Sequence, residues 1–252
     1  MANSHDNHLQ GRVSVITGAS SGIGAATARA LAARGARVVL AARNVDKPNT
    51  LVTGIREAGG TASARSTDVT RLDDVEGLIE FAADEYGPVD HLVNNAGLTL
   101  FSKWSDRAVD DWDKMIDTNL RGCLHAISAV LPGMIARRSG HILNLGSVAG
   151  IRVGGASGVY SATKFFIRGI TDSLRQEVGI THGIQVSMIS PGVIDTGWAD
   201  KVSNTEGKRI AQDLNEGAIH PDRVAGAVVY ALDQPADVTV NDIVIHPTRQ
   251  DW

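Results

Sequence analysis

The chain has 252 residues, of which 43% are hydrophobic and 21% charged, a balance typical of a globular protein with one large α/β domain or two small ones. A net charge of −4 excludes the basic surface of a protein that binds nucleic acid or anionic membranes. The single cysteine, Cys123, excludes a disulfide within the chain and favours the cytoplasm, and no apolar run is long enough to span a bilayer. The histidines are scattered without metal-ligand spacing, so we expect no metal site.

The first ten residues are polar and lack the apolar core of a signal peptide. We expect residues 1–10 to form a mobile tail ahead of a single domain that covers residues 11–252.

The first structural unit is a strand, a glycine-rich turn and a helix. Residues 13–17 are β-branched and apolar, as in a buried parallel strand, and an alanine-rich helical pattern covers residues 25–34. Glycines between them would let the backbone approach a pyrophosphate, whose charge the helix N-terminus favours. The spacing is GxxxGxG rather than GxGxxG, and a purely structural turn is the alternative. The candidate cofactor residues here are Gly18, Ser20, Ser21, Gly22, Ile23 and Gly24.

The end of the second predicted strand, residues 37–41, bears on cofactor choice. An acidic residue there would bind the adenosine ribose of NAD, but this chain continues with Arg43 and Asn44. A guanidinium fork suits the 2′-phosphate of NADP(H), so we favour NADP(H), with Ser20, Ser21 and Asn44 as helpers. The alternative is that Arg43 is a solvated loop charge.

The next elements continue the alternation. Helices are expected at residues 46–58 and 72–86, and strands at residues 61–66 and 89–93. Asp68, after the third strand, could accept a hydrogen bond from an adenine amino group or cap the following helix. The turn after the fourth strand, Asn94-Asn95-Ala96-Gly97, could lie against a ribose or be structural only.

Two long helical patterns, residues 108–118 and 120–138, meet at Asn119. Because asparagine is unfavourable inside a helix, we expect a kink there. A fifth strand at residues 141–145 leads to Ser147, just past its carboxyl end, where ligands bind in open parallel sheets.

Tyr160 and Lys164 lie on the next helix, which runs to about residue 180. Four residues apart, they share one helix face. A nearby ammonium favours the phenolate form of a tyrosine, so this phenol could exchange a proton with an alcohol or carbonyl held by Ser147. A chance surface pair is the alternative.

The remaining chain supplies a sixth strand at residues 184–189, a helix at 221–232 and a seventh strand at 241–245. Between the sixth strand and this helix, residues 195–217 are largely polar, with glycines and charges and the large apolar Trp198, and we interpret them as a substrate lid that is mobile. Seven strands alternating with helices predict an α/β Rossmann fold, with one doubly wound parallel sheet and helices on both faces.

Together these motifs resemble the short-chain dehydrogenase/reductase family over nearly the whole chain. The matching segments keep the family's order and spacing: TGASSGIG at 17–24, Asp68, NNAG at 94–97, Asn119, Ser147, YSATK at 160–164 and PGVIDT at 191–196. The resemblance implies a catalytic tetrad of Asn119, Ser147, Tyr160 and Lys164. In it Tyr160 is the general acid/base, Ser147 positions the substrate oxygen, Lys164 binds the nicotinamide ribose and Asn119 holds a water that links Lys164 to solvent.

The resemblance also assigns cofactor contacts. Thr196 and the backbone near Ile194 would hold the nicotinamide carboxamide, and members with an arginine at this position usually prefer NADP(H). The further cofactor residues are Val69, Asn95, Ala96, Gly97, Tyr160, Lys164, Pro191 and Gly192.

The chain departs from the family pattern in two places. Gly146-Ser147 replaces a common pair of serines, and His246-Pro247-Thr248-Arg249-Gln250 replaces a glycine-rich close after the last strand. That tail is similar to the branch that contains clavulanate dehydrogenase and the hydroxy-acid dehydrogenases.

We therefore expect an NADP(H)-dependent oxidoreductase that transfers hydride between nicotinamide and a ketone or aldehyde, or the matching alcohol. Arg152 near the entrance would favour a carboxylate substrate if it points inward; the other pocket candidates are Leu98, Val148, Val153, Ser157 and Trp198. The alternatives are an NAD-linked hydroxy-acid or alcohol dehydrogenase and an NADPH-sensing protein without turnover. Family analogy predicts a homotetramer built on helices 120–138 and 160–180. The cysteine usage predicts the cytoplasm, and the net charge predicts no nucleic-acid or membrane partner.

Overall fold

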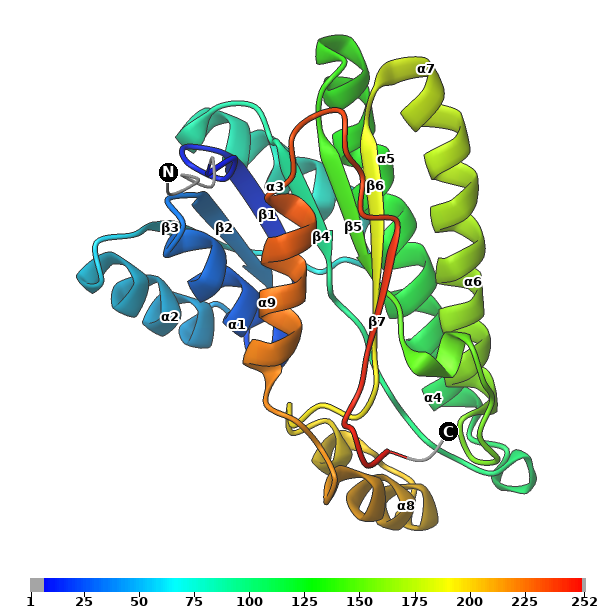
Figure 1. Ribbon diagram of the computed structural model, residues 1–252. Helices are drawn as coiled ribbons and strands as arrows, with labels where there is room; N and C mark the ends of the chain where they lie inside the picture. The colour runs from blue at the N-terminus through cyan, green and yellow to red at the C-terminus, as the bar shows by residue number, and fades with distance from the viewer. Residues whose placement is uncertain (1–6, 251–252) are drawn as a thin grey trace.

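The computed structural model describes residues 7–250 of the chain and contains one parallel sheet (Figure 1). Its strands are β1 (Val13–Thr17), β2 (Arg37–Ala42), β3 (Thr61–Ser66), β4 (His91–Asn94), β5 (His141–Leu145), β6 (Gln185–Pro191) and β7 (Asp242–Ile245). Their order in the sheet is β3-β2-β1-β4-β5-β6-β7, and each neighbouring pair is parallel. The predicted doubly wound sheet is confirmed.

The strand order reverses between β1 and β4, which lie side by side in the sheet. From β1 the chain builds outward to β3, then returns to β4 and builds the other way to β7. Loops leave the carboxyl ends of β1 and β4 in opposite directions at such a switch point and leave a crevice between them. The glycine turn follows β1 and the NNAG turn follows β4, so the topology brings both motifs to this crevice.

Helices cover both faces of the sheet. They are α1 (Gly22–Ala32), α2 (Asp46–Glu57), α3 (Leu72–Tyr86), α4 (Val109–Met115), α5 (Gly122–Arg137), α6 (Gly158–Leu174), α7 (Ile180–His182), α8 (Thr205–Asn215) and α9 (Pro221–Leu232). One face packs on α1, α2 and α9, and the other on α3, α5 and α6 (Figure 1). The strands are covered on both faces, which explains why every residue of β1 and β5 is buried, with no alternation between buried and exposed positions.

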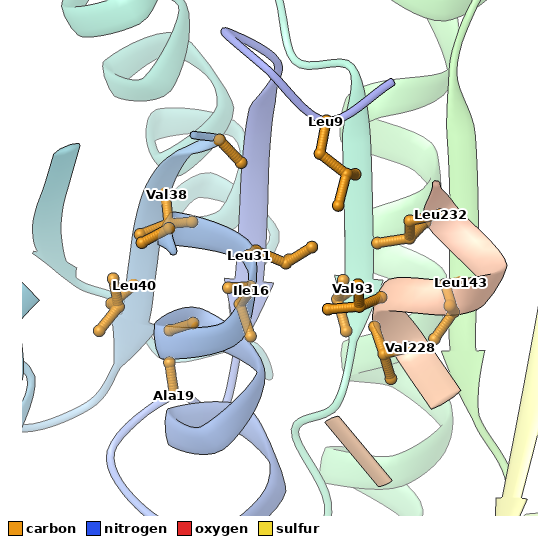
Figure 2. Packing of buried hydrophobic residues seen from close by; sticks show 14 of the residues in the cluster. Leu9, Ile16, Ala19, Leu31, Val38, Leu40, Val93, Leu143, Val228 and Leu232 are labelled. Atoms are coloured by element: carbon orange, nitrogen blue, oxygen red, sulfur yellow. The ribbon is translucent and has the colours of Figure 1, made fainter. Parts of the chain in front are cut away.

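Figure 2 shows the core on the α1 and α9 side of the sheet. Leu31 of α1 and Val228 and Leu232 of α9 pack over Ile16 of β1 and Leu143 of β5. All five side chains are buried, and small alanines along α1 let it lie close to both the sheet and α9. This packing fixes the N-terminus of α1 directly behind the glycine turn.

The interruption expected at Asn119 is present as a π-helical segment, η2 (Ile116–Arg121), between α4 and α5. Asn119 is buried in this segment, and its side chain bonds to the backbone of Leu98 rather than to its own helix. Single-turn π segments within α-helices are rare and occur frequently at functional sites. A second π segment, η4 (Arg175–Gly179), joins α6 to α7 and had no sequence signal.

Besides shifts of a few residues at the ends of other elements, three differences from the sequence-based expectation stand out. The fourth strand begins at His91 rather than at Val89, because the Asp90 carboxylate accepts a hydrogen bond from Val13 N at 2.9 Å. The polar segment at 195–217 contains helix α8, which Asn204 caps by accepting a hydrogen bond from Gly207 N at 2.8 Å.

The third difference concerns the predicted tail, whose residues 1–6 lie outside the described part of the chain. Residues 7–10 are not a mobile tail, because Leu9 is fully buried in the core beside α1 and α9 (Figure 2). Within residues 7–250, no helix is both long enough and apolar enough to cross a membrane.

Candidate active site

A cavity of about 500 Å³ lies along the carboxyl ends of the strands. The segments that follow β1 to β6 all line it, so residues far apart in the sequence lie around the same cavity. The predicted residues that line it are Gly18, Ser20, Ser21, Gly22, Ile23, Arg43, Asp68, Val69, Asn95, Ala96, Gly97, Ser147, Tyr160, Lys164, Pro191, Gly192, Ile194 and Thr196. Gly24, Asn44 and Asn119 do not line it.

The glycine turn lines the cavity with backbone atoms at Gly18 and Gly22, where no side chain intervenes. Gly22 has a φ of +56°, and a Cβ there would lie 2.7 Å from Cβ of Thr196. Ser21 precedes α1 without a side-chain cap, and the first turn of α1 contains no acidic residue. The first amide groups of this helix are therefore open to an external anion, which fits the pyrophosphate of a dinucleotide.

Asn95 holds the glycine turn to the end of β4. Its Nδ2 donates to the carbonyl oxygens of Thr17 at 2.9 Å and of Gly18 at 3.0 Å. Gly24 packs against this amide group instead of lining the cavity. Of the two interpretations of the NNAG turn, the Asn95 side chain therefore has the structural role, while Ala96 and Gly97 line the cavity.

Arg43 and Asp68 stand at the end of the cavity formed by β2 and β3. Burial raises the pKa of Asp68, but hydrogen bonds from Thr70 and the charges of Arg43 and Arg71 outweigh it, so the pKa lies below its usual 3.8. Asp68 Oδ1 accepts from Thr70 N at 3.0 Å and from Thr70 Oγ1 at 2.8 Å. Asp68 is thus an anion whose hydrogen bonds order the loop before α3. This role resembles the predicted helix cap, although the residue that precedes α3 is Arg71.

Asn44 has a local role at the start of α2. Its Oδ1 accepts a hydrogen bond from Asp46 N at 2.8 Å, and the residue does not line the cavity. Arg43 is exposed on the same loop and does line it. Of the two neighbours, only the guanidinium is placed where it could reach a ligand.

Ser147, Tyr160 and Lys164 come together in the cavity wall beyond β5. Ser147 is buried at the start of a short 3₁₀ turn, and its Oγ accepts from Ala149 N at 3.1 Å. Lys164 is 9% exposed, and its Nζ donates to the carbonyl oxygen of Leu145 at 2.8 Å. The same Nζ lies 5.9 Å from the centroid of the Tyr160 ring. A nearly buried ammonium is thus held beside a half-buried phenol.

Asn119 lies behind this wall, and its side chain joins two segments of the chain by hydrogen bonds; we call this role a clasp. Its Oδ1 accepts from Leu98 N at 2.7 Å, and its Nδ2 donates to Leu98 O at 2.9 Å and Thr163 Oγ1 at 3.0 Å. Thr163 Oγ1 in turn donates to the carbonyl oxygen of Tyr160 at 2.7 Å. The side chain of Asn119 therefore ties the segment after the NNAG turn to the first turn of α6.

The far end of the cavity is mainly apolar. The predicted pocket residues Leu98, Val148, Arg152, Val153, Ser157 and Trp198 all line it. Phe101, which sequence reasoning missed, packs against Tyr160 and Trp198 with ring centroids 6.1 and 5.3 Å away. Lys201, Leu214 and Gln250 also line the cavity. Lys201 and Leu214 fall in the predicted lid, and Gln250 falls in the tail that departs from the family pattern, whereas Phe101 carries no sequence signal.

Two further observations concern groups outside the cavity. Burial raises the pKa of the Cys123 thiol to about 12, although the charge of Lys164 partly opposes this. The thiol is therefore protonated and unreactive at neutral pH. Across residues 7–250, no group of three or more His, Cys, Asp and Glu side chains is gathered closely enough to hold a metal ion.

Comparison with known proteins gives consistent matches. The family model for short chain dehydrogenases matches residues 12–207. An uncharacterised oxidoreductase of Staphylococcus saprophyticus is 42% identical over 247 residues, which cover 97% of this chain and 99% of that protein.

Solved structures agree. The closed form of a serine dehydrogenase complexed with NADP+ has a TM-score of 0.87 and 31% identity, over 95% of this chain and 96% of that one. A short-chain dehydrogenase/reductase from Burkholderia phymatum in complex with NAD also has a TM-score of 0.87, with 27% identity over 94% and 89% of the two chains.

Proposed function

The chain belongs to the short-chain dehydrogenase/reductase family, and from that premise we propose that it is an NADP(H)-dependent oxidoreductase that interconverts a ketone or aldehyde with the matching alcohol. The observation that carries the proposal is the shared cavity: Ser147, Tyr160 and Lys164 line the same space as the glycine turn. A proton-transfer group beside a dinucleotide cradle is the combination that hydride transfer to or from a carbonyl group needs.

The cofactor contacts divide along the cavity. The first turn of α1 and the glycine turn would hold the pyrophosphate, and Arg43 with Ser20 and Ser21 would hold the 2′-phosphate. Asp68 and Val69 would flank the adenine. Asn95, Ala96, Gly97, Tyr160 and Lys164 would meet the nicotinamide ribose, and Pro191, Gly192, Ile194 and Thr196 the carboxamide. When bound, the nicotinamide would supply or take up the hydride.

Proton transfer falls to Tyr160. In reduction its hydroxyl gives a proton to the substrate oxygen, and in oxidation the phenolate takes that proton back. The ammonium of Lys164, held by Leu145 O at 2.8 Å, places a positive charge 5.9 Å from the centre of the Tyr160 ring, where it would favour the charge that the phenol carries after giving up its proton. Ser147 Oγ would donate a hydrogen bond to the same substrate oxygen, without losing its proton, and so hold the carbonyl beside the phenol.

Asn119 acts through position rather than through contact with substrate. Its bonds to Leu98 and Thr163 set the distance between the NNAG segment and the first turn of α6. Because Thr163 also bonds the Tyr160 carbonyl, a shift of Asn119 would move the phenol relative to the cofactor cradle.

The proposed preference for NADP(H) depends on Arg43, since no acidic residue stands at the end of β2 to bind a ribose hydroxyl pair. Structural neighbours have been solved with NADP+ and with NAD, so the family alone does not decide between the two. The substrate side combines the apolar Leu98, Val148 and Phe101 with Arg152 at its rim. This lining favours a carbonyl compound with an apolar body.

The test is a panel of ketones, aldehydes, hydroxy acids and alcohols, run in parallel with NADPH or NADP+ and with NADH or NAD+. We expect turnover of apolar carbonyl compounds and a higher kcat/KM with NADPH. Tight NADPH binding without turnover of any panel member would favour a non-catalytic sensor. A higher kcat/KM with NADH would contradict the cofactor assignment.

We further propose a cytoplasmic homotetramer that acts on a small molecule. The single cysteine suits a reducing compartment, and α5 and α6 carry the exposed apolar side chains Leu124 and Phe165, at 42% and 43% exposure. Light scattering on the purified protein tests the assembly: a monomer at micromolar concentration would contradict it.

A further inference from the structure

The C-terminal segment that departs from the family pattern folds back onto the loop after β6 (Figure 1). Gly192 N donates to Ile245 O at 2.8 Å, which continues the pairing of β6 with β7 by one residue. One residue later, Val193 N donates to the side-chain Oε1 of Gln250 at 3.0 Å. Gln250 N itself donates to Pro247 O at 3.0 Å, so residues 247–250 form a tight turn that presents the Gln250 side chain to this loop.

The loop is shaped to receive this tail. A Cβ at position 192 would lie 2.2 Å from Oε1 of Gln250 and 2.5 Å from Cβ of His246. No larger residue fits there while the tail is in place. In this chain, Gly192 is therefore required by the tail at least as much as by any ligand.

The other edge of the loop is held by backbone alone. Ile219 N donates to Val193 O at 3.2 Å, and Asp195 N donates to Ile219 O at 3.0 Å. Among residues 7–250, the acceptor for Val193 N is the Gln250 side chain. Without that side chain, one edge of the Val193 peptide loses its partner, while the other remains fixed.

The position of this peptide matters because of its neighbours. Val193 immediately precedes Ile194, and Gln250, Ile194 and Thr196 all line the cavity. We propose that Gln250 is a positioning residue, which fixes the Val193 peptide so that Ile194 and Thr196 are held in place for the nicotinamide end of the cofactor. This inference rests on the proposed function, because that end of the cavity is assigned through it.

The proposal separates the two ends of the cofactor. Arg43 and Asp68, which would hold the 2′-phosphate and flank the adenine, follow β2 and β3, and three strands of the sheet separate them from β6, whose following loop Gln250 contacts. Loss of the Gln250 acceptor should therefore weaken binding of the whole dinucleotide and leave binding of its adenosine half unchanged. A general loss of folding would weaken both.

The experiment measures the Kd of NADPH and of 2′,5′-ADP, which lacks the nicotinamide half, on the full chain by calorimetry. Gln250→Leu should weaken NADPH about tenfold, equivalent to about 1.4 kcal/mol, and leave 2′,5′-ADP within about twofold. Gln250→Glu keeps a side-chain oxygen at the same reach and should bind NADPH within about threefold of the wild type. Arg249→Leu is the matched control, because Arg249 is an exposed neighbour in the same turn and does not line the cavity.

Three results would overturn the inference. They are unchanged NADPH binding in Gln250→Leu, equal weakening of both ligands, and a Gln250→Glu variant as weak as Gln250→Leu. If Gln250→Leu does not fold, Gln250→Asn, whose shorter side chain cannot reach Val193 N, provides the same comparison. Failure of the wild type to bind NADPH would instead contradict the proposed function, so the two failures are distinguishable.

Discussion

Replacement of Asn119 by leucine tests whether this residue acts as a clasp. The substitution keeps the branching and the number of heavy atoms of the side chain and removes three hydrogen bonds, two to the backbone of Leu98 and one to Thr163. Thr163 keeps its own hydrogen bond to the Tyr160 carbonyl. The substitution therefore removes only the hydrogen bonds that Asn119 makes to Leu98, after the NNAG turn, and to Thr163 of α6.

The expected loss of stability follows from burial. Asn119 is 2% exposed, so water cannot readily replace the lost partners. Each hydrogen bond contributes about 1 kcal/mol net, and a buried group left without a partner costs about 1–3 kcal/mol. Leucine recovers about 0.5 kcal/mol through its better helix propensity. We expect the free energy of unfolding to fall by about 3–4 kcal/mol, a large part of the roughly 5–15 kcal/mol of a typical protein.

Urea unfolding at one fixed protein concentration measures this loss. The midpoint of Asn119→Leu should fall while the slope of free energy against urea stays constant. Asn49→Leu is the control, because Asn49 is exposed on α2 and should change stability by less than about 0.5 kcal/mol. A loss below about 1 kcal/mol for Asn119→Leu would refute the clasp, since at least one backbone group of Leu98 must then have found another partner.

Three further predictions concern charge and burial. Arg43→Asp should lower kcat/KM for NADPH by about 100-fold and change that for NADH by less than about threefold, and equal effects would contradict the phosphate contact. Burial raises the pKa of Cys123 to about 12, so a thiol reagent at about pH 8 should label it only after unfolding, and rapid labelling of the native protein would be the contrary result. Burial also lowers the pKa of His91 and of His141 to about 3, against about 6.5 when unfolded. The unfolded chain therefore binds more protons as the pH falls from about 6.5 to about 3, and stability should fall by up to about 1.4 kcal/mol per pH unit for each histidine, a slope that His141→Asn should reduce.

The sheet could be predicted because its signals are local. Strands such as β1, β4 and β5 are short segments rich in apolar residues that end at or just before a glycine or asparagine, and parallel strands buried on both faces need no alternating pattern. Their alternation with helices then predicts one parallel sheet whose strands are joined by helical crossovers. Strand β1 and helix α3 have the bounds that the pattern predicts, whereas the start of β4 depends on a contact between Asp90 and Val13 that no local pattern contains.

The site residues that could be predicted are those whose side-chain chemistry and spacing in the sequence both indicate one role. Tyr160, Lys164 and Ser147 could be found because few other roles need those residue types near a strand end. For Asp68, the sequence left two roles open, and the bonds to Thr70 favour the structural one without removing the residue from the cavity wall.

Residues that act through long-range contacts were beyond sequence reasoning. Phe101 and Gln250 reach the cavity only because the chain folds back on itself, one after β4 and the other after β7. Helix α8 was missed for a related reason: its sequence is polar apart from a narrow apolar edge that packs on Phe101 and Val202. Short amphipathic helices of this kind depend on tertiary packing for their stability.

The most direct test of the proposed chemistry is the Tyr160→Phe variant, assayed for NADPH affinity and for turnover of the best carbonyl substrate in the same preparation. The variant keeps the ring that packs on Phe101 and loses only the hydroxyl. We predict a Kd for NADPH within about threefold of the wild type and a fall in kcat of at least about 100-fold, the usual contribution of a general acid. A variant that keeps more than about a tenth of wild-type turnover would contradict the assignment of Tyr160 as the proton donor.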